Sequence, residues 1–162
     1  MTVRVCFVCL GNICRSPAAA AIMQAKVKAA GLENEIEIDS AGTGNWHIGE
    51  SAHKYTLKEA KKRGIPINHV VKQFNADLFD MFDYILAADH ENMADLLDLA
   101  PDQEAAAKVQ LLRSFDPDAD DDEVPDPFYD ELEGFAQVFD MIDAACDGLL
   151  EHIENEHALT SN

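Results

Sequence analysis

The N-terminal stretch constrains the fold most, because an apolar run, a tight turn and a helical stretch follow one another directly. Residues 3–9 (VRVCFVC) are β-branched, aromatic and apolar, which is typical of a buried strand. Residues 16–31 have the pattern of a helix, with Ser16 as the expected N-cap, Pro17 at the first helical position and Gly31 at the end. This order predicts a strand and a helix that are joined by one short turn.

Strands and helices continue to alternate along the rest of the chain. Three further strands are expected at residues 35–42, 83–89 and 108–112. Three further helices are expected at residues 50–64, 90–100 and 131–154. A length of 162 residues is that of one domain. We therefore predict a single α/β domain with a four-stranded parallel sheet and helices on both faces, in which ligands bind beyond the carboxyl ends of the strands.

The turn CLGNICRS, at residues 9–16, has the composition of an anion-binding loop. Backbone N–H groups and the positive end of the helix point into such a turn. Arg15 can add a bidentate guanidinium, and Gly11 and Asn12 are the residue types that best tolerate a positive φ. Cys9 begins the turn, and the same positive field favours its thiolate. The turn is therefore predicted to bind a phosphate dianion and to present a nucleophile to it.

The overall charge excludes several classes of partner. The chain has 31 acidic and 12 basic residues, and its formal net charge of -19 should repel nucleic acid and anionic membranes. No apolar run reaches membrane-spanning length, and the stretch at residues 3–10 is interrupted by Arg4 and reads as a core strand rather than a signal peptide. We expect no nucleic-acid partner, no membrane insertion and a cytoplasmic location. A saline habitat and basic substrates both stay open as explanations of the acidity.

The four cysteines are expected to be reduced thiols, as in a cytoplasmic protein. Cys6 and Cys9 form a C-x-x-C, but the chain has no second cysteine pair, so a metal site is not expected. Cys6 and Cys146 are interpreted as buried core thiols. No nucleotide-binding glycine motif is present. The sequence therefore predicts no metal and no organic cofactor.

Four motifs together resemble those of the low-molecular-weight protein tyrosine phosphatases. They are CLGNICRSP at residues 9–17, DSAGTGNWHIG at 39–49, RGI at 63–65 and VPDPFYD at 124–130. The resemblance spans most of the chain and implies a four-stranded parallel sheet flanked by helices, in agreement with the predicted order. It also implies a phosphatase domain over residues 1–157, followed by a short C-terminal tail at residues 158–162.

The resemblance implies roles for individual residues. Cys9 would be the nucleophile that forms a phosphocysteine, Arg15 would clamp the phosphate oxygens, and Asp126 would be the general acid and then the general base. Ser16 would hydrogen-bond the Cys9 sulfur. The other residues implied to bind substrate are Leu10, Gly11, Asn12, Ile13, Cys14, Trp46, Phe128 and Tyr129. The residues implied to support the loop, together with Asn12, are Ser40, His69 and Asp89, the last beside Asn92.

Ordinary structural explanations compete with several of these roles. Asp126 lies in an acidic run at residues 116–127 that would usually be a solvated loop, and only Pro127 and the aromatic pair after it distinguish this residue. The three aromatic residues are either hydrophobic cover or the walls of a slot for a phenyl ring. His69 is either a core histidine or part of the network. The histidines expected on the surface are His47, His53 and His90.

The sequence departs from the family's pattern at two places. The family often has two tyrosines after D-P, but here Phe128 comes first, so only Tyr129 remains as a possible phosphorylation site. A frequent H-x-A-R-Q appears here as HVVKQ at residues 69–73. Lys72 replaces the arginine, which leaves any role of that cation open.

Three other functions are weighed against phosphotyrosine hydrolysis. An arsenate reductase on this fold needs two more cysteines after the third strand, and residues 87–103 contain none, although Cys14 could still resolve Cys9. The protein-arginine phosphatases that resemble this chain have threonine where Ile13 stands. A catalytically idle phosphotyrosine-binding module would have lost Cys9 or Asp126.

The predicted function is therefore hydrolysis of protein phosphotyrosine by a monomeric enzyme. Its partners would be proteins or peptides that contain phosphotyrosine, with inorganic phosphate as product and inhibitor. Cys9 and Cys14 lie five residues apart on one loop, which predicts a reversible disulfide that protects the nucleophile from over-oxidation.

Overall fold

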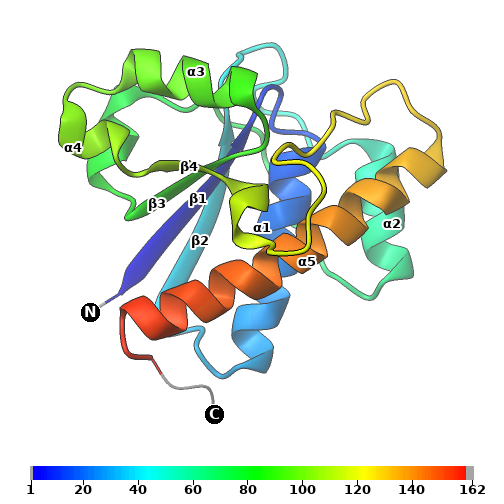
Figure 1. Cartoon of the computed structure of the whole chain (residues 1–162). Coiled ribbons are helices and arrows are strands. Elements are labelled where there is room, and N and C mark those ends of the chain that lie inside the picture. The colour runs from blue at the N-terminus through cyan, green and yellow to red at the C-terminus, as the bar shows by residue number, and fades with distance from the viewer. Residues whose placement is uncertain (1, 160–162) are drawn as a thin grey trace.

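The computed structural model describes residues 2–159, so residues 160–162 of the predicted tail lie outside it. Its four strands form one parallel sheet in the order β2-β1-β3-β4. The strands are β1 (Val3–Cys9), β2 (Ile36–Gly42), β3 (Tyr84–Ala87) and β4 (Val109–Leu111). The predicted parallel sheet is confirmed. Because β1 lies between β2 and β3, the loop after β1 leaves from the middle of the sheet, at the point where the chain changes sides (Figure 1).

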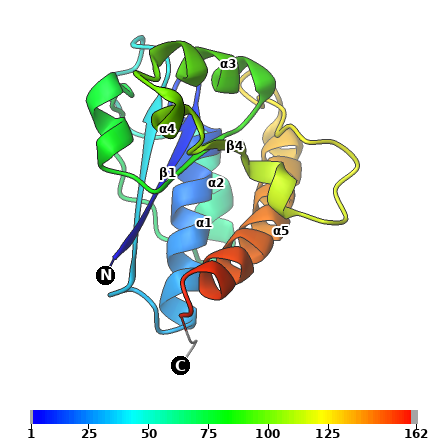
Figure 2. The same cartoon turned by 60° about the vertical axis from the view of Figure 1, so that its left-hand side comes forward.

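Helices cover both faces of the sheet, as predicted (Figure 2). One face carries α1 (Arg15–Ala29), α2 (Lys54–Lys62), the short 3-10 helix η2 (Leu112–Phe115) and α5 (Leu132–Glu156). The other face carries the 3-10 helix η1 (Ala76–Asp80), α3 (His90–Leu99) and α4 (Gln103–Ala106). The helices α1 and α5 lie side by side in both views. No helix of residues 2–159 has the length and apolar composition needed to cross a membrane.

Burial on both faces explains why β1 is apolar from Val5 to Cys9, after the exposed Arg4. Val5 and Phe7 belong to the core beneath α1 and α5, whereas Cys6 and Val8 belong to the core beneath α3. Cys6 and Cys146 are fully buried, as predicted, and burial raises the pKa of both thiols. These two cysteines are therefore inert parts of the core.

Two helix starts differ from the prediction. The helix α1 begins at Arg15, so Ser16 is not the N-cap, and Cys14 holds that position without a side-chain cap. The helix α2 begins at Lys54 rather than residue 50, because His53 caps it by accepting a hydrogen bond from the N–H of Tyr55. Gly31 follows the end of α1 with a φ of 73°, as a residue without a side chain can.

Candidate active site

The loop between β1 and α1 turns its carbonyl groups outward. The carbonyls of Cys9 and Leu10 accept hydrogen bonds from Thr43 and Gly44, and the carbonyl of Ile13 accepts one from His53. No peptide bond is cis among residues 2–159, so each N–H points away from the carbonyl that precedes it. Residues 10, 11 and 14 each follow one of these outward carbonyls, so their N–H groups are directed into the loop. This is the geometry of an anion cradle.

Asn12 holds the cradle in shape from behind. It is fully buried and has a φ of 57°, the left-handed region that Asn tolerates better than most residues. Its side-chain amide donates to Ser16 Oγ (2.7 Å) and Ser40 Oγ (3.0 Å), and its Oδ1 accepts from the N–H of Lys72 (3.1 Å). Its carbonyl lies 2.7 Å from His69 Nε2. Ser40 and His69 thus contact the loop where the sequence predicted a supporting network.

His69 and Lys72 have defined partners in this network. Burial is the main cause that lowers the pKa of His69, so its ring is neutral near pH 7 and can donate from Nε2 to the Asn12 carbonyl. The Lys72 ammonium pairs with Asp39, away from the loop. The cation that replaces the family's arginine therefore supports the loop through its backbone N–H rather than its charge.

Glycines allow two close approaches around the loop. A Cβ at Gly42 would lie 2.8 Å from the carbonyl oxygen of Leu10, so the end of β2 can meet the loop only without a side chain. Gly11 does not have a positive φ, in contrast to the expectation. Its small size matters instead, because a Cβ there would lie 3.2 Å from the ring of His47.

Cys9 lies at the bottom of the cradle with polar partners on its sulfur. Its Sγ is 3.0 Å from Ser16 Oγ and accepts a hydrogen bond from the Ser16 N–H at 3.4 Å. Ser16 is in the first turn of α1, where unpaired N–H groups and the helix dipole stabilise negative charge. The side chain that was expected to cap α1 is therefore used to contact the sulfur.

Arg15 connects the loop to two acidic residues. Its Nη1 donates to Asp89 Oδ2 (2.6 Å) and to the carbonyl of Val124 (3.0 Å), and its Nη2 lies 3.6 Å from Asp126 Oδ2. Burial would lower the pKa of Arg15, but Cys9, Asp89 and Asp126 more than offset burial, so the pKa is raised and the guanidinium stays charged. Its buried Nε has no hydrogen-bond partner within residues 2–159 and can donate to an anion.

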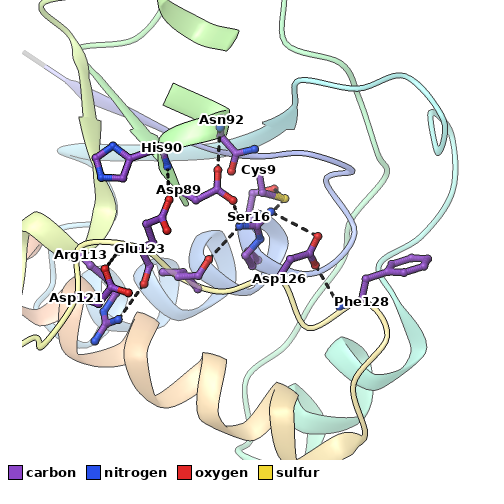
Figure 3. A network of polar contacts seen from close by, with 12 residues as sticks. Cys9, Ser16, Asp89, His90, Asn92, Arg113, Asp121, Glu123, Asp126 and Phe128 are labelled. Carbon is purple, nitrogen blue, oxygen red and sulfur yellow. Dashed lines mark hydrogen bonds and ion pairs between the residues drawn. The ribbon is translucent and has the colours of Figure 1, made fainter. Parts of the chain in front are cut away.

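Asp89 shares its two oxygens between the site and a helix. One oxygen binds Arg15, and the other accepts a hydrogen bond from the N–H of Asn92 at 2.8 Å and so caps α3. Figure 3 shows Cys9, Ser16, Asp89 and Asp126 gathered at the N-terminal end of α1. The carboxyl end of β3 thus fixes the direction of the guanidinium.

The acidic run that holds Asp126 is anchored at its C-terminal part. Val124 is fully buried and pairs with Ala88 through its N–H (2.8 Å) and with Arg15 through its carbonyl. Pro127 is buried as well. Asp126 lies between these two buried residues with 43% of its side chain exposed, and its Oδ1 accepts a hydrogen bond from the Phe128 N–H. The run is therefore anchored to the core on both sides of Asp126, although the Asp126 side chain itself stays accessible to solvent.

A buried arginine that sequence reasoning missed also holds this run. Arg113 is 7% exposed, and it donates to the carbonyl of Glu123 (2.8 Å) and to Asp120 (3.1 Å). From the other side, the N–H and ring of the exposed His90 contact Glu123 and Asp122. Figure 3 shows Glu123 between Arg113 and His90, on the same loop as Asp126.

Replacing Arg113 with methionine is expected to lower kcat for an aryl phosphate about tenfold, because Asp126 would lose part of its support and small displacements of reacting groups are costly. The matched control is Arg4→Met, which removes an exposed ion pair with Glu37 on the far part of β1. Steady-state kinetics of both variants, with circular dichroism to confirm folding, provides the measurement. Equal kcat values in both variants would show that Arg113 has no positioning role.

The loop opens into a pocket of about 290 Å³. Its lining residues are Cys9, Leu10, Gly11, Ile13, Cys14, Arg15, Trp46, His47, Asp126, Phe128 and Tyr129. Asn12 and Ser16, which were predicted to bind substrate, are buried beside the loop and do not line this pocket. All three aromatic residues line the pocket, although Trp46 is 68% and Tyr129 is 95% exposed. The ring of Trp46 packs over Gly44, where any Cβ would clash with it.

Two histidines expected on the surface belong to this pocket or its wall. His47 is half-buried and lines the pocket, and His53 packs its ring 5.7 Å from that of Phe128 and 4.8 Å from that of Phe135. Burial lowers the pKa of His53, with Lys54 acting in the same direction. His90 is exposed, as expected. The sequence offered one indication that His47 lines the pocket, because it directly follows Trp46, which was predicted to bind substrate.

Comparisons with known proteins agree with this site. The family model of low molecular weight phosphotyrosine protein phosphatases matches residues 4–159. A low molecular weight protein-tyrosine-phosphatase of Streptomyces coelicolor is 45% identical, over 96% of each chain. A solved protein tyrosine phosphatase of Entamoeba histolytica superposes with a TM-score of 0.93 at 36% identity, over 96% of this chain and 99% of that chain.

A further solved structure, described as a Drosophila arginine phosphatase, superposes with a TM-score of 0.87 at 32% identity, over 93% of this chain and 97% of that chain. The matched family model, the anion-binding loop after β1, Asp89 after β3 and Asp126 in the acidic run before α5 support the same assignment. The chain belongs to the low molecular weight phosphotyrosine protein phosphatase family.

Proposed function

We propose that this phosphatase hydrolyses protein phosphotyrosine through a phosphocysteine intermediate. The observation that carries the proposal is the outward direction of the loop carbonyls, which aims a set of N–H groups at the space above Cys9. Those groups, the first turn of α1 and Arg15 supply the positive field that a phosphate dianion needs on a protein of strongly negative net charge. Surface acids beyond a Debye length of about 8 Å are screened from the site.

In the first step, the Cys9 thiolate attacks phosphorus and forms an S–P bond while the P–O bond to the tyrosine oxygen breaks. Arg15 holds the equatorial oxygens through its free Nε and its Nη groups. A phenolate with a pKa of about 10 is a poor leaving group near neutral pH. Asp126, on the rim of the pocket, donates the proton that releases tyrosine as a phenol.

In the second step, water attacks the phosphorus of the phosphocysteine, and the Asp126 carboxylate left by the first step accepts a proton from that water. The S–P bond breaks and its electron pair returns to Cys9 as a thiolate. Ser16 stabilises that thiolate, because its Oγ and N–H both lie within hydrogen-bonding range of Cys9 Sγ. Inorganic phosphate leaves from the same cradle, so we infer that it also inhibits the enzyme.

The walls of the pocket favour a phenyl ring over a guanidinium. Ile13 is apolar and buried, and Phe128 and Trp46 supply flat apolar surface at the mouth. The second candidate is arginine dephosphorylation, which the likeness to the Drosophila structure keeps open. The relatives of that specificity have threonine where Ile13 stands, so Ile13 is the residue that separates the two.

Arsenate reduction and a binding-only role have less support. The segment from β3 through α3 contains no cysteine to pass a disulfide outward, and both Cys9 and Asp126 are present in the pocket. We retain the predictions of a monomer in the cytoplasm. The site residues need no metal ion in this mechanism, since amides and Arg15 neutralise the phosphate.

The proposal is tested with phosphotyrosyl, phosphoseryl and phosphoarginyl peptides of the same sequence, at about pH 6 and without added metal. Phosphate release from the phosphotyrosyl peptide alone is the expected result. Release chiefly from the phosphoarginyl peptide would assign the second candidate function. No release from any peptide, with Cys9 still reactive toward iodoacetate, would contradict the proposed hydrolysis.

Peroxide treatment is expected to join Cys9 to Cys14. Peroxide would oxidise the Cys9 thiolate to a sulfenic acid, and Cys14 would then attack that sulfur and expel water. Burial raises the pKa of Cys14 to about 12, with Cys9 and Asp126 acting in the same direction. The closing step is therefore expected to accelerate about tenfold per pH unit between pH 7 and 9, as the thiolate fraction grows.

Peptide mass mapping after timed peroxide exposure measures this disulfide. Cys14→Ser is the control, because it leaves Cys9 open to oxidation in the same pocket but removes the thiol that would close the disulfide. Protein that loses activity to peroxide without a Cys9–Cys14 crosslink at either pH would refute the switch.

A further inference from the structure

The exposed face of α2 carries four lysines, Lys54, Lys58, Lys61 and Lys62, which we name the α2 lysine row. At 3.6 residues per turn, their spacing places them within a sector of about 100° of the helix surface. The opposite face of the helix is buried and holds Thr56, Glu59 and Ala60. The row is thus a continuous positive stripe on a protein whose net charge is -19.

The chain leaves this row without acidic partners. No lysine of the row forms an ion pair with an acid of residues 2–159, whereas most lysines and arginines elsewhere in that range do. Lys28 and Lys108 are the other exceptions, and Lys108 instead donates to a backbone carbonyl. Like charges four residues apart destabilise a helix. An unpaired row of this kind is available to an anionic partner.

The row begins at the wall of the candidate active site. Lys54 directly follows His53, whose ring packs against the pocket residue Phe128. From Lys54 to Lys62 the helix rises about 12 Å, at 1.5 Å per residue. An extended peptide covers that length in about four residues. A chain that leaves the pocket over Phe128 therefore meets the row within a few residues.

The end of the row adjoins an apolar groove. This groove has a volume of about 370 Å³ and runs between α2 and the segment that follows it. Its lining residues are Leu57, Ala60, Lys61, Gly64, Ile65, Pro66 and Ile67. Leu57 is 36% exposed there. Apolar surface beside cationic side chains suits a peptide better than it suits a free anion.

We propose that the α2 lysine row binds an acidic segment of the phosphoprotein substrate, close in sequence to its phosphotyrosine. The inference rests on the proposed function. A short segment touches only the row, whereas an extended anionic surface such as a membrane or nucleic acid also meets the surrounding acidic surface and is repelled. The acidity of the remaining surface then rejects acidic chains that approach the pocket from other directions.

The test compares three phosphotyrosyl peptides that carry four glutamates, four glutamines or four lysines, beginning two residues from the phosphotyrosine on either side. The enzyme variants are the quadruple K54Q/K58Q/K61Q/K62Q and the control Lys28→Gln, which removes an unpaired lysine in the last turn of α1. Glutamine keeps the helix propensity of lysine, so α2 should stay folded. Hydrolysis of p-nitrophenyl phosphate reports on the pocket alone.

We expect the wild-type enzyme to show about a tenfold higher kcat/KM for the glutamate peptide than for the glutamine peptide at low salt, from several weak exposed ion pairs. The quadruple variant should lose this preference and Lys28→Gln should keep it, while both hydrolyse p-nitrophenyl phosphate normally. Added salt at about 0.5 M should also remove the preference of the wild-type enzyme for the glutamate peptide.

Three results would overturn the inference. The first is equal kcat/KM for the glutamate and glutamine peptides. The second is a higher kcat/KM for the lysine peptide, which would show that the acidic surface, and not the row, selects the substrate. Alternatively, row-dependent binding to phosphatidylserine vesicles without any peptide preference would assign the row to lipid. If wild-type enzyme hydrolysed neither p-nitrophenyl phosphate nor any peptide, the proposed function itself would fail.

Discussion

Replacing Cys9 with serine is expected to lower kcat for a phosphotyrosyl peptide by about 10⁵-fold or more, the scale seen when a hydrolase loses its nucleophile. A serine hydroxyl is far less acidic than a thiol and stays protonated, so the variant lacks an ionised nucleophile. The Cβ–O bond of serine is also shorter than the Cβ–S bond of cysteine, so the oxygen lies farther from phosphorus. Stopped-flow or discontinuous phosphate assays measure the loss.

The same variant should still bind inorganic phosphate, because the outward carbonyls, Asn12 and Arg15 that shape the cradle do not involve the Cys9 sulfur. Isothermal titration of phosphate tests this directly. Cys6→Ser is an unsuitable control because Cys6 is a core residue, so Lys28→Gln provides the reference for handling and folding. A residual kcat within a hundredfold of the wild type would show that Cys9 is not the nucleophile.

Replacing Asp126 with asparagine is expected to lower kcat for phosphotyrosine by about 10³-fold, within the range that a general acid contributes. Asparagine keeps the size of the side chain and can still pair with the Phe128 N–H, but it has no proton to give to a phenolate of pKa about 10. The kcat of this variant should fall far less for an aryl phosphate whose phenolate is already stable, such as p-nitrophenyl phosphate.

The measurement is kcat against the pKa of the leaving phenol for a series of aryl phosphates. The plot should be nearly flat for the wild type and steep for Asp126→Asn. Asp118→Asn, on the exposed part of the same acidic run, is the matched control and should behave as the wild type. A uniform loss across the whole series in Asp126→Asn would point to an electrostatic role of Asp126 on Arg15, not to proton transfer.

Local pattern was sufficient for the sheet and for the loop. The apolar run of β1 after Arg4 follows from burial on both faces, and the cysteine, asparagine and arginine of the turn each have a local reason to be there. The reason for Gly11 is not local, because the ring of the distant His47 lies close to it. The helix starts were harder to predict. Ser16 has the composition of an N-cap, but its hydroxyl contacts Cys9 and Asn12, and a tertiary contact of this kind overrides the local preference.

Contacts between distant segments could not be predicted from local pattern. Arg113 is buried only because the acidic run folds back over η2, and nothing near Arg113 in the sequence indicates that path. The ring of His53 packs against that of Phe128, a residue far along the chain on the loop before α5. In both cases the decisive partner lies on a loop whose route depends on the packed core, so the interaction is visible only once the chain is folded.

The buried, left-handed Asn12 has a consequence for the thermodynamics of ligand binding. Its three side-chain hydrogen bonds fix the loop in the folded chain without a ligand, so the conformational entropy of the loop is lost during folding. A phosphate that enters finds its donors already oriented, and little further ordering opposes its binding. The native state therefore carries a preformed recognition element whose affinity should change little with the length or flexibility of the peptide attached to the phosphate.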